Sequence, residues 1–174
     1  VCGPFPIESL GRKRYFVTFI DLCSDFSELY FIREKSEVPE ITINFVEKLK
    51  TKFNRKPKIV RTDRGTEYNN KTLQEYLEKE GIKYQCTVGY APEQNGVAER
   101  KNRTIVEAVR TMLDESGLPK SLWAEAADTA NYVFNRIVGK NKEQSPYEKF
   151  YGKPPSDKIF YRFGQDALIM IPDE

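Results

Sequence analysis

Two carboxylates, those of Asp63 and Glu99, have the type and the surroundings to hold metal ions for chemistry on phosphate groups. Asp63 directly follows a run at residues 58–62 that is typical of a short strand, and Gly65 comes two residues later. A strand end before a glycine turn commonly presents a side chain to an open crevice. The same position also suits an aspartate that only hydrogen-bonds its own turn, so both roles stay open for Asp63.

Glu99 falls in the first turn of a helix that we predict from residue 97 to residue 116, after a glycine-containing loop at 88–96. The same helical face carries Asn102 and Arg103, which are groups that suit contact with DNA. Metal-assisted phosphoryl transfer on DNA requires a carboxylate in such surroundings. A structural role is also open, because acids are favoured near helix N-termini and Glu99 can pair with Arg103 one turn later.

The sequence contains no histidine, and its three cysteines, Cys2, Cys23 and Cys86, are not at zinc-ligand spacing. Ser-His-Asp and Cys-His catalysis and metal sites built from histidine are therefore excluded. Hard ions such as Mg²⁺ prefer carboxylate oxygens, and two of them about 3.5–4 Å apart can activate a water or a 3′-hydroxyl without any histidine. Any catalysis is thus predicted to depend on acids and a metal.

Positive charge is concentrated in one segment, although the net charge of the whole chain is only +2. From residue 48 to residue 64 the only acid is Asp63, and the segment has eight basic residues: Lys48, Lys50, Lys52, Arg55, Lys56, Lys58, Arg61 and Arg64. Such a surplus can attract a polyanion such as DNA. The alternative is a solvated helix end and loop without a partner.

Hydrophobic patterning predicts strands, then a helix, a strand, a helix and a strand, and finally helices, which is typical of a mixed α/β domain with a central sheet. The predicted strands are residues 15–20, 29–32, 58–62, 83–87 and 165–171. The predicted helices are residues 39–53, 71–80, 97–116 and 121–138. No apolar run approaches the ~18 residues of a membrane span, so no membrane partner is expected.

Two sequence blocks at a set distance resemble the integrase catalytic core of copia-type (Ty1/copia) retrotransposons, which is part of a Pol polyprotein. The first is RTDRGTEY at residues 61–68, and the second is YAPEQNGVAERKNRT at residues 90–104. Between Asp63 and Glu99 lie 35 residues (99 − 63 − 1), which is the interval between the last two acids of the retroviral integrase triad. The resemblance extends over nearly the whole chain.

This resemblance implies an α/β, RNase H-like fold in which a central mixed sheet is flanked by helices. It also implies metal-dependent DNA integration, in which the 3′ ends of element DNA are processed and joined to target DNA with Mg²⁺ or Mn²⁺ as the cofactor. We expect a single integrase core domain over residues 1–174, with the RNase H-like part at roughly 1–140 and a C-terminal extension at 141–174.

The resemblance gives Asp63 and Glu99 the catalytic and metal-binding positions of the family. Positions that contact DNA in relatives are matched by Tyr90, Gln94, Asn95, Lys101 and Arg103. The expected partners are element ends, target DNA and further copies of the chain. The expected location is the nucleus during integration and a cytoplasmic virus-like particle before it.

The sequence departs from the family pattern near the expected site. The first catalytic aspartate of the family lies directly before the segment matched here by VCGP at residues 1–4, so we expect it to precede Val1. The 174-residue chain by itself is therefore expected not to process or join DNA. Asp21 matches a different recurring acid and is taken as a neighbour of the site, and Arg64 replaces a usual asparagine.

Two other functions compete with integration. A host-retained domain that binds DNA or protein without catalysis fits the missing aspartate and Arg64, whereas Asp63 and Glu99 argue against it. Another RNase H-like nuclease, such as a resolvase, is disfavoured by the block NGVAERKN at residues 95–102. The codons upstream of Val1 would separate the first two functions, because an aspartate there in a long open reading frame favours the enzyme.

Overall fold

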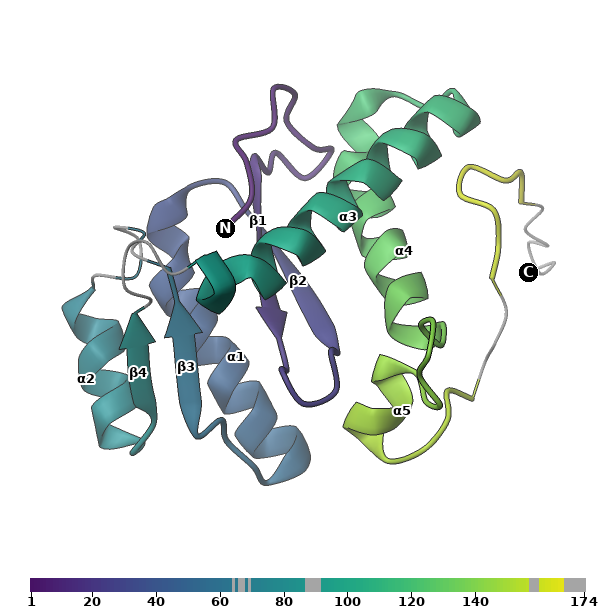
Figure 1. Cartoon of the computed structure of the whole chain (residues 1–174). Coiled ribbons are helices and arrows are strands. Elements are labelled where there is room, and N and C mark those ends of the chain that lie inside the picture. Colours follow the sequence, from purple (N-terminus) through teal and green to yellow (C-terminus); the bar gives the residue numbers. More distant parts are fainter. Residues whose placement is uncertain (64, 66–67, 69, 87–91, 157–159, 168–174) are drawn as a thin grey trace, which may run out of the picture. The chain divides into compact units, whose positions relative to one another are not determined.

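The computed structural model describes the chain from residue 1 to residue 174 apart from 64, 66–67, 69, 87–91, 157–159 and 168–174, and it describes only the backbone at 92–95. The chain folds as two compact units (Figure 1). The first unit comprises Val1–Thr18 and Leu29–Arg103, and the second comprises Phe19–Glu28 and Thr104–Glu174. Both units are discontinuous in sequence, because one hairpin and one long helix pass from the first to the second.

The strands come before the last three α-helices in the chain, as Figure 1 labels them. The strands are β1 (Tyr15–Ile20), β2 (Ser27–Ile32), β3 (Ile59–Thr62) and β4 (Lys83–Cys86). The α-helices are α1 (Val38–Phe53), α2 (Lys71–Lys79), α3 (Pro92–Ser116), α4 (Trp123–Arg136) and α5 (Pro146–Tyr151). Short 3-10 helices, Lys35–Glu37 and Lys120–Leu122, precede α1 and α4.

Strands β1 and β2 form a two-stranded hairpin. The amide of Arg14 donates to the carbonyl of Ile32 at one end (3.0 Å), and the amide of Asp21 donates to the carbonyl of Phe26 at the other (2.9 Å). These two bonds make the strands antiparallel. The aromatic and β-branched sequence of β1 favours this extended conformation.

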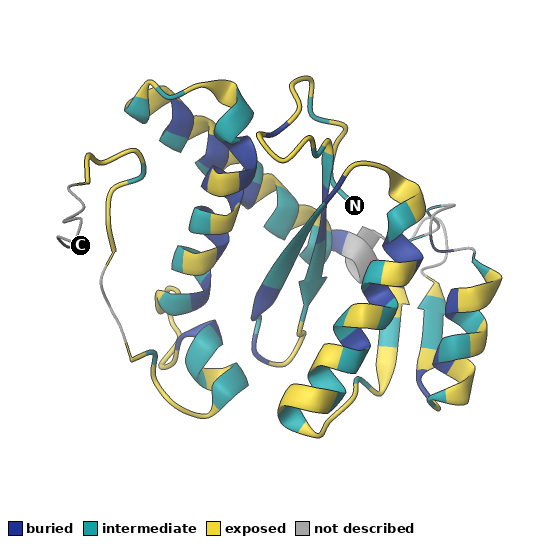
Figure 2. Cartoon of the chain, turned by 180° about the vertical axis from the view of Figure 1, so that it is seen from behind, coloured by how far each residue is buried: buried dark blue, intermediate teal, exposed yellow. Residues whose placement is uncertain are grey.

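Strands β3 and β4 run parallel, in a register that pairs Ile59 with Lys83 and Thr62 with Cys86. A parallel pair needs a crossover connection, and α2 provides it. Helix α2 begins at the N-cap Asn70, whose side chain accepts from the amide of Leu73 (3.1 Å). Buried and exposed positions alternate along its turns (Figure 2), so that α2 covers one side of the pair.

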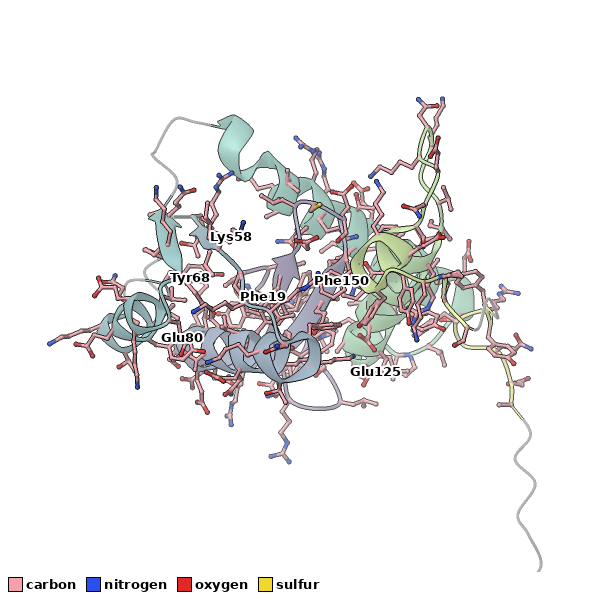
Figure 3. All side chains as sticks on the ribbon, turned by 90° about the horizontal axis from the view of Figure 1, so that it is seen from below. Phe19, Lys58, Tyr68, Glu80, Glu125 and Phe150 are labelled. Atoms are coloured by element: carbon pink, nitrogen blue, oxygen red, sulfur yellow. The ribbon has the colours of Figure 1, made fainter. Side chains whose placement is uncertain are left out.

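A polar cluster ties α2 to α1 within the first unit. The Lys50 ammonium lies 3.0 Å from carboxylate oxygens of both Glu47 and Glu80, and Glu80 ends α2 beside α1 (Figure 3). The Tyr76 hydroxyl donates to Glu47 at 2.6 Å. This bond, followed by the bond from Lys50, holds the pKa of Glu47 below its usual range. The cluster therefore stabilises the helix layer that supports β3 and β4.

In the second unit, a buried polar network fastens α4 to the start of β2. The side chain of Asn135 accepts from the amide of Ser27 (3.0 Å) and donates to its carbonyl (2.7 Å). Asn131 donates to the same carbonyl at 2.9 Å and accepts from the Ser27 hydroxyl at 2.5 Å. These residues are at most 5% exposed, so the network replaces the hydration that the strand end would otherwise need.

Helix α5 packs on the turn of the hairpin within the second unit. The rings of Phe26 and Phe150 stack with their centroids 4.4 Å apart, and Tyr151 meets Phe26 edge-on at 5.5 Å. Lys142 also pairs with Asp25 in this turn. The segment beyond residue 140 thus contributes α5 to the same unit as α4, and the predicted extension from residue 141 stays a prediction.

Most predicted elements are confirmed, whereas the start of one helix and one predicted strand are wrong. Helix α3 begins at Pro92, five residues before the predicted start, because proline suits a first turn and a buried Gly96 fits inside the helix. The strand predicted at 165–171 is absent over its described part, 165–167, because the amide of Gln165 closes a turn on the carbonyl of Arg162 (3.1 Å).

Within the described ranges, none of the helices has the length and hydropathy of a membrane span.

Replacing Asn135 by alanine should lower the free energy of unfolding by about 2–3 kcal/mol, because the buried amide and carbonyl of Ser27 both lose a partner. The measurement is chemical denaturation. Asn44→Ala is the matched control, since Asn44 is exposed on α1 and its replacement should change stability by less than about 0.5 kcal/mol. Equal effects of the two substitutions would show that the network does not stabilise the hairpin.

Candidate active site

Asp63 stands at the carboxyl end of β3, as predicted, and is half-buried. Its carboxylate atom Oδ1 accepts from the amide of Gly65 at 3.1 Å. The turn-capping role that the sequence allowed is therefore real. A carboxylate has about four lone-pair sites on two oxygens, so this cap leaves acceptor capacity at Oδ2 for another group. Capping and metal binding are compatible at this residue.

Glu99 lies on α3 and is exposed, so that its carboxylate faces solvent. Three residues later, the side-chain oxygen of Asn102 accepts from the hydroxyl of Thr18 on β1 at 2.7 Å. Residues three apart on a helix are neighbours on one face. The Thr18–Asn102 bond therefore sets the face of Glu99 against the end of β1 within the first unit.

The start of the chain lies along β1 in the same unit. The amide of Cys2 donates to the carbonyl of Phe16 at 2.9 Å, and the amide of Phe16 donates back at 3.0 Å. Such a reciprocal pair is the hydrogen-bonded pair of an antiparallel ladder. Position 2 is thus opposite position 16, and the two side chains are on the same face of the ladder.

Asp21 has a local partner. Its Oδ2 atom accepts from the amide of Ser24 at 2.9 Å and from the Ser24 hydroxyl at 2.5 Å. These bonds hold the turn after β1, which belongs to the second unit, whereas Asp63 and Glu99 belong to the first. The structure thus gives Asp21 a role in the hairpin turn, and its place as a neighbour of the site stays a prediction.

The other predicted site residues fall in two groups. Tyr90 and Arg64 lie outside the described residues, and so do the side chains of Gln94 and Asn95, whose backbone is in the first turn of α3. Lys101 is half-buried and Arg103 is exposed on the same helix. Sequence reasoning missed Thr18 as a contact of α3, because nothing in a strand sequence marks which polar residue meets a helix.

The basic segment at 48–64 is less positive in space than in sequence. Glu80 pairs with Lys50 (3.0 Å) and Lys56 (3.7 Å), and Glu47 pairs with Lys50 as well (3.0 Å). Both acids lie outside the segment 48–64, and their ion pairs neutralise part of its positive charge. Exposed cations remain at Arg55, Lys58 and Arg61, and Arg61 donates to Gln85 on β4 at 3.2 Å. Lys48 and Lys52 on α1 are exposed as well. Positive charge therefore remains on α1 and along β3.

The donor set of this site suits a hard cation but is small. Among the residues that the structure describes, no three Asp, Glu or Cys side chains gather closely enough to hold a metal ion together. Asp63 and Glu99 offer carboxylate oxygens, which are the ligands that Mg²⁺ prefers. A magnesium site shared by these two carboxylates stays a prediction.

The integrase core domain family matches residues 2–92, which are 91 of the 174 residues of the chain. The chain belongs to this family. The match contains Asp63 and ends before Glu99. The chain is therefore an integrase core, a domain from a class of enzymes that transfer polynucleotide strands. This is the kind of domain that the two sequence blocks predicted.

Three relatives are Pol polyproteins of transposons. The chain is 46% identical over 175 residues to the Pol polyprotein of transposon TNT 1-94 from Nicotiana tabacum, covering 100% of this chain and 13% of that protein. It is 34% identical over 160 residues to that of RE2 from Arabidopsis thaliana (91% and 11%) and 32% identical over 168 residues to the Ty1-NL2 Gag-Pol polyprotein of Saccharomyces cerevisiae (94% and 10%). The copia-type resemblance is confirmed, and the integrase core spans 10–13% of the length of these relatives.

Two solved structures show the fold. A chain of the simian T-cell lymphotropic virus intasome in complex with PP2A regulatory subunit B56 gamma superposes with a TM-score of 0.65 at 16% identity, covering 91% of this chain and 54% of that one. The HTLV-2 integrase catalytic core domain in complex with magnesium, in a trimeric form, gives 0.59 at 19% identity, covering 77% and 82%. The integrase core thus has the predicted α/β, RNase H-like fold.

Replacing Thr18 by valine should loosen the attachment of α3, because the isosteric side chain cannot donate to Asn102. The free energy of unfolding should fall by about 1 kcal/mol, and amide exchange should speed up over residues 97–103. Thr111→Val is the matched control, since Thr111 is exposed on the same helix and its hydroxyl bonds only the carbonyl of Glu107 (3.2 Å) among the described contacts. Unchanged exchange in Thr18→Val would rule out the anchoring role of this bond.

Proposed function

We propose that this integrase core processes the 3′ ends of retrotransposon DNA and joins them to target DNA, with Mg²⁺ or Mn²⁺ held at Asp63 and Glu99. The observation that carries the proposal is the placement of these two acids. Asp63 stands at the carboxyl end of β3, Glu99 stands on α3, and both belong to the first unit of a chain in the integrase core family. The magnesium in the HTLV-2 core structure supports the choice of metal.

The residues of this chain have separate roles in the proposed reaction. Asp63 would bind the metal ion through Oδ2, the oxygen that does not cap its turn. Glu99 would bind the metal ion from the exposed face of α3. When bound, the metal supplies Lewis acidity at the reacting phosphate. Lys101 and Arg103 bind the phosphates of the DNA ends, with Tyr90, Gln94 and Asn95 before them in the chain. These contacts orient the DNA strand against the two acids.

A third carboxylate is proposed on the residue before Val1. Because Cys2 is opposite Phe16, an antiparallel ladder puts Val1 opposite Val17 and the preceding residue opposite Thr18. Opposite residues have Cβ atoms about 4.5–5.5 Å apart on one face. Thr18 donates to Asn102, one turn from Glu99. An aspartate at that position would therefore point toward the face that carries Glu99.

The partners and location follow from the same reaction. We propose that the integrase core contacts element ends and target DNA, acts as a homo-oligomer, and works in the nucleus after passage through a cytoplasmic virus-like particle. One of the two structural relatives is part of an intasome and the other is a trimeric form, which supports assembly with further copies. The exposed cations Arg55, Lys58 and Arg61 support an additional phosphate surface along β3.

Changing Lys101 and Arg103 together to alanine should weaken binding to unrelated DNA duplexes by a similar factor for each sequence. The slope of log K against log salt should become shallower by about 1 for each lost phosphate contact. Fluorescence anisotropy at several salt concentrations measures both quantities. Lys71→Ala on α2, which removes an exposed cation paired with Glu75 (3.6 Å), is the control. Binding that ignores salt, or that survives the double substitution unchanged, would exclude α3 as the DNA surface.

Adding an aspartate-bearing strand before Val1 should give Mn²⁺-dependent strand transfer on an oligonucleotide substrate. Asp63→Asn and Glu99→Gln should each lower that activity at least about 100-fold, because a displaced ligand or reacting group costs rate steeply. Asp21→Asn tests the competing ligand and should leave the rate within about threefold. Activity that is lost in Asp21→Asn and retained in Asp63→Asn would reverse the assignment. No activity in the extended chain would favour a non-catalytic, host-retained domain that binds DNA or protein.

A further inference from the structure

The peptide group of Asp63 is held by hydrogen bonds from β3 and β4. The Thr62 hydroxyl donates to the carbonyl oxygen of Asp63 at 3.0 Å, and the Tyr84 hydroxyl lies 2.9 Å from the same Thr62 oxygen. A threonine hydroxyl has one proton. While Thr62 donates to Asp63, Tyr84 must therefore donate to Thr62, so the two hydroxyls form one directed chain.

A second donor reaches the same carbonyl oxygen. The thiol of Cys86 lies 3.4 Å from it and completes a pair of donors with Thr62. Sulfur is a weak donor, so Thr62 supplies the stronger of the two bonds. The carbonyl of Asp63 is thus oriented from its own strand and from the neighbouring strand.

The register of the parallel pair explains why these residues meet. Val60 is opposite Tyr84, and Thr62 is opposite Cys86. Thr62 and Tyr84 are therefore diagonal neighbours on one face of the pair, which a tyrosine is long enough to bridge. Thr62 is only 8% exposed, and a bond shielded from water is stronger than the same bond in solvent.

We propose that Tyr84 and Thr62 are positioning residues for the reaction, and that they act by setting the direction of the Asp63 carboxylate. The chain Tyr84–Thr62–Asp63 fixes the peptide plane of Asp63, and the Gly65 amide fixes Oδ1. Because the peptide plane of Asp63 and its Oδ1 atom are both held, Oδ2 points in one direction, and a metal ion would bind there. The catalytic part of this inference rests on the proposed function of Asp63.

Amide exchange at Gly65 tests the chain of bonds in the 174-residue protein without metal. Tyr84→Phe and Thr62→Val each remove one hydroxyl and should speed exchange at Gly65 about fivefold, as the loss of one net hydrogen bond predicts. Thr62→Ser keeps the hydroxyl and should restore slow exchange. Tyr76→Phe is the matched control, since it removes a tyrosine hydroxyl bonded to Glu47 between α1 and α2 and should leave Gly65 unchanged.

Strand transfer by the extended chain tests the catalytic consequence. Tyr84→Phe should lower kcat about tenfold and leave the KM for DNA within twofold, because positioning affects the reacting geometry rather than DNA binding. Unchanged exchange at Gly65 in Tyr84→Phe would overturn the chain of bonds, and unchanged kcat would overturn its role in the reaction. Full activity of Asp63→Asn would instead overturn the proposed function, while the Gly65 measurement would still decide whether the hydroxyl chain exists.

Discussion

The parallel pairing of β3 with β4 is the constraint on which the candidate active site depends. It determines where β3 ends, and the first residue after that end is Asp63. The same register brings Thr62 beside Cys86 and within reach of Tyr84, so that the pairing also orients the peptide group of Asp63. Helix α2 makes the pairing possible as the crossover, and the Glu47–Lys50–Glu80 cluster fastens α2 to α1. An acid placed by several such layers has a well-defined position before any metal binds.

Glu99 depends on a different contact. A helix surface offers many orientations, and the bond between Thr18 and Asn102 helps to hold the face of Glu99 toward β1. The pairing of Cys2 with Phe16 extends the sheet on the same strand. The start of the chain, β1 and α3 are thereby in contact within the first unit. Acids brought together in such a region repel each other without a cation.

The sequence predicted the positions of the acids better than their surroundings. Proline and glycine signals and apolar periodicity placed α1, α2 and β3 within one or two residues, and the position of Asp63 after β3 followed from them. The start of α3 was wrong because Gly96 reads as a loop residue, whereas inside the helix it is buried and a Cβ added there would first meet the flexible Arg100 side chain. Helix α5 was missed although the sequence has a serine that can cap its start, Ser145, and a glycine that can end it, Gly152. In the structure Ser145 is the N-cap and Gly152 adopts the left-handed conformation.

Contacts between strands and helices could not be read from the sequence. Neither Tyr84 nor Thr18 has a motif, since their roles depend on register and on helix docking, which arise only in the folded chain. The partial neutralisation of the basic segment has the same origin, because Glu80 is far from Lys50 in sequence and meets it only when α2 packs on α1. The sequence therefore indicates which groups can do chemistry, and the fold decides which groups hold them in place.

Paramagnetic broadening by Mn²⁺ tests most directly the claim that Asp63 and Glu99 share one metal site. In a ¹H–¹⁵N spectrum of the chain, low Mn²⁺ concentrations should broaden the amide signals of Gly65 and of Glu99 together. Asp63→Asn should abolish both effects, while Asp21→Asn should leave both in place. Broadening at Gly65 alone, or broadening of the Glu99 signal that survives Asp63→Asn, would contradict a shared site and the account built on it.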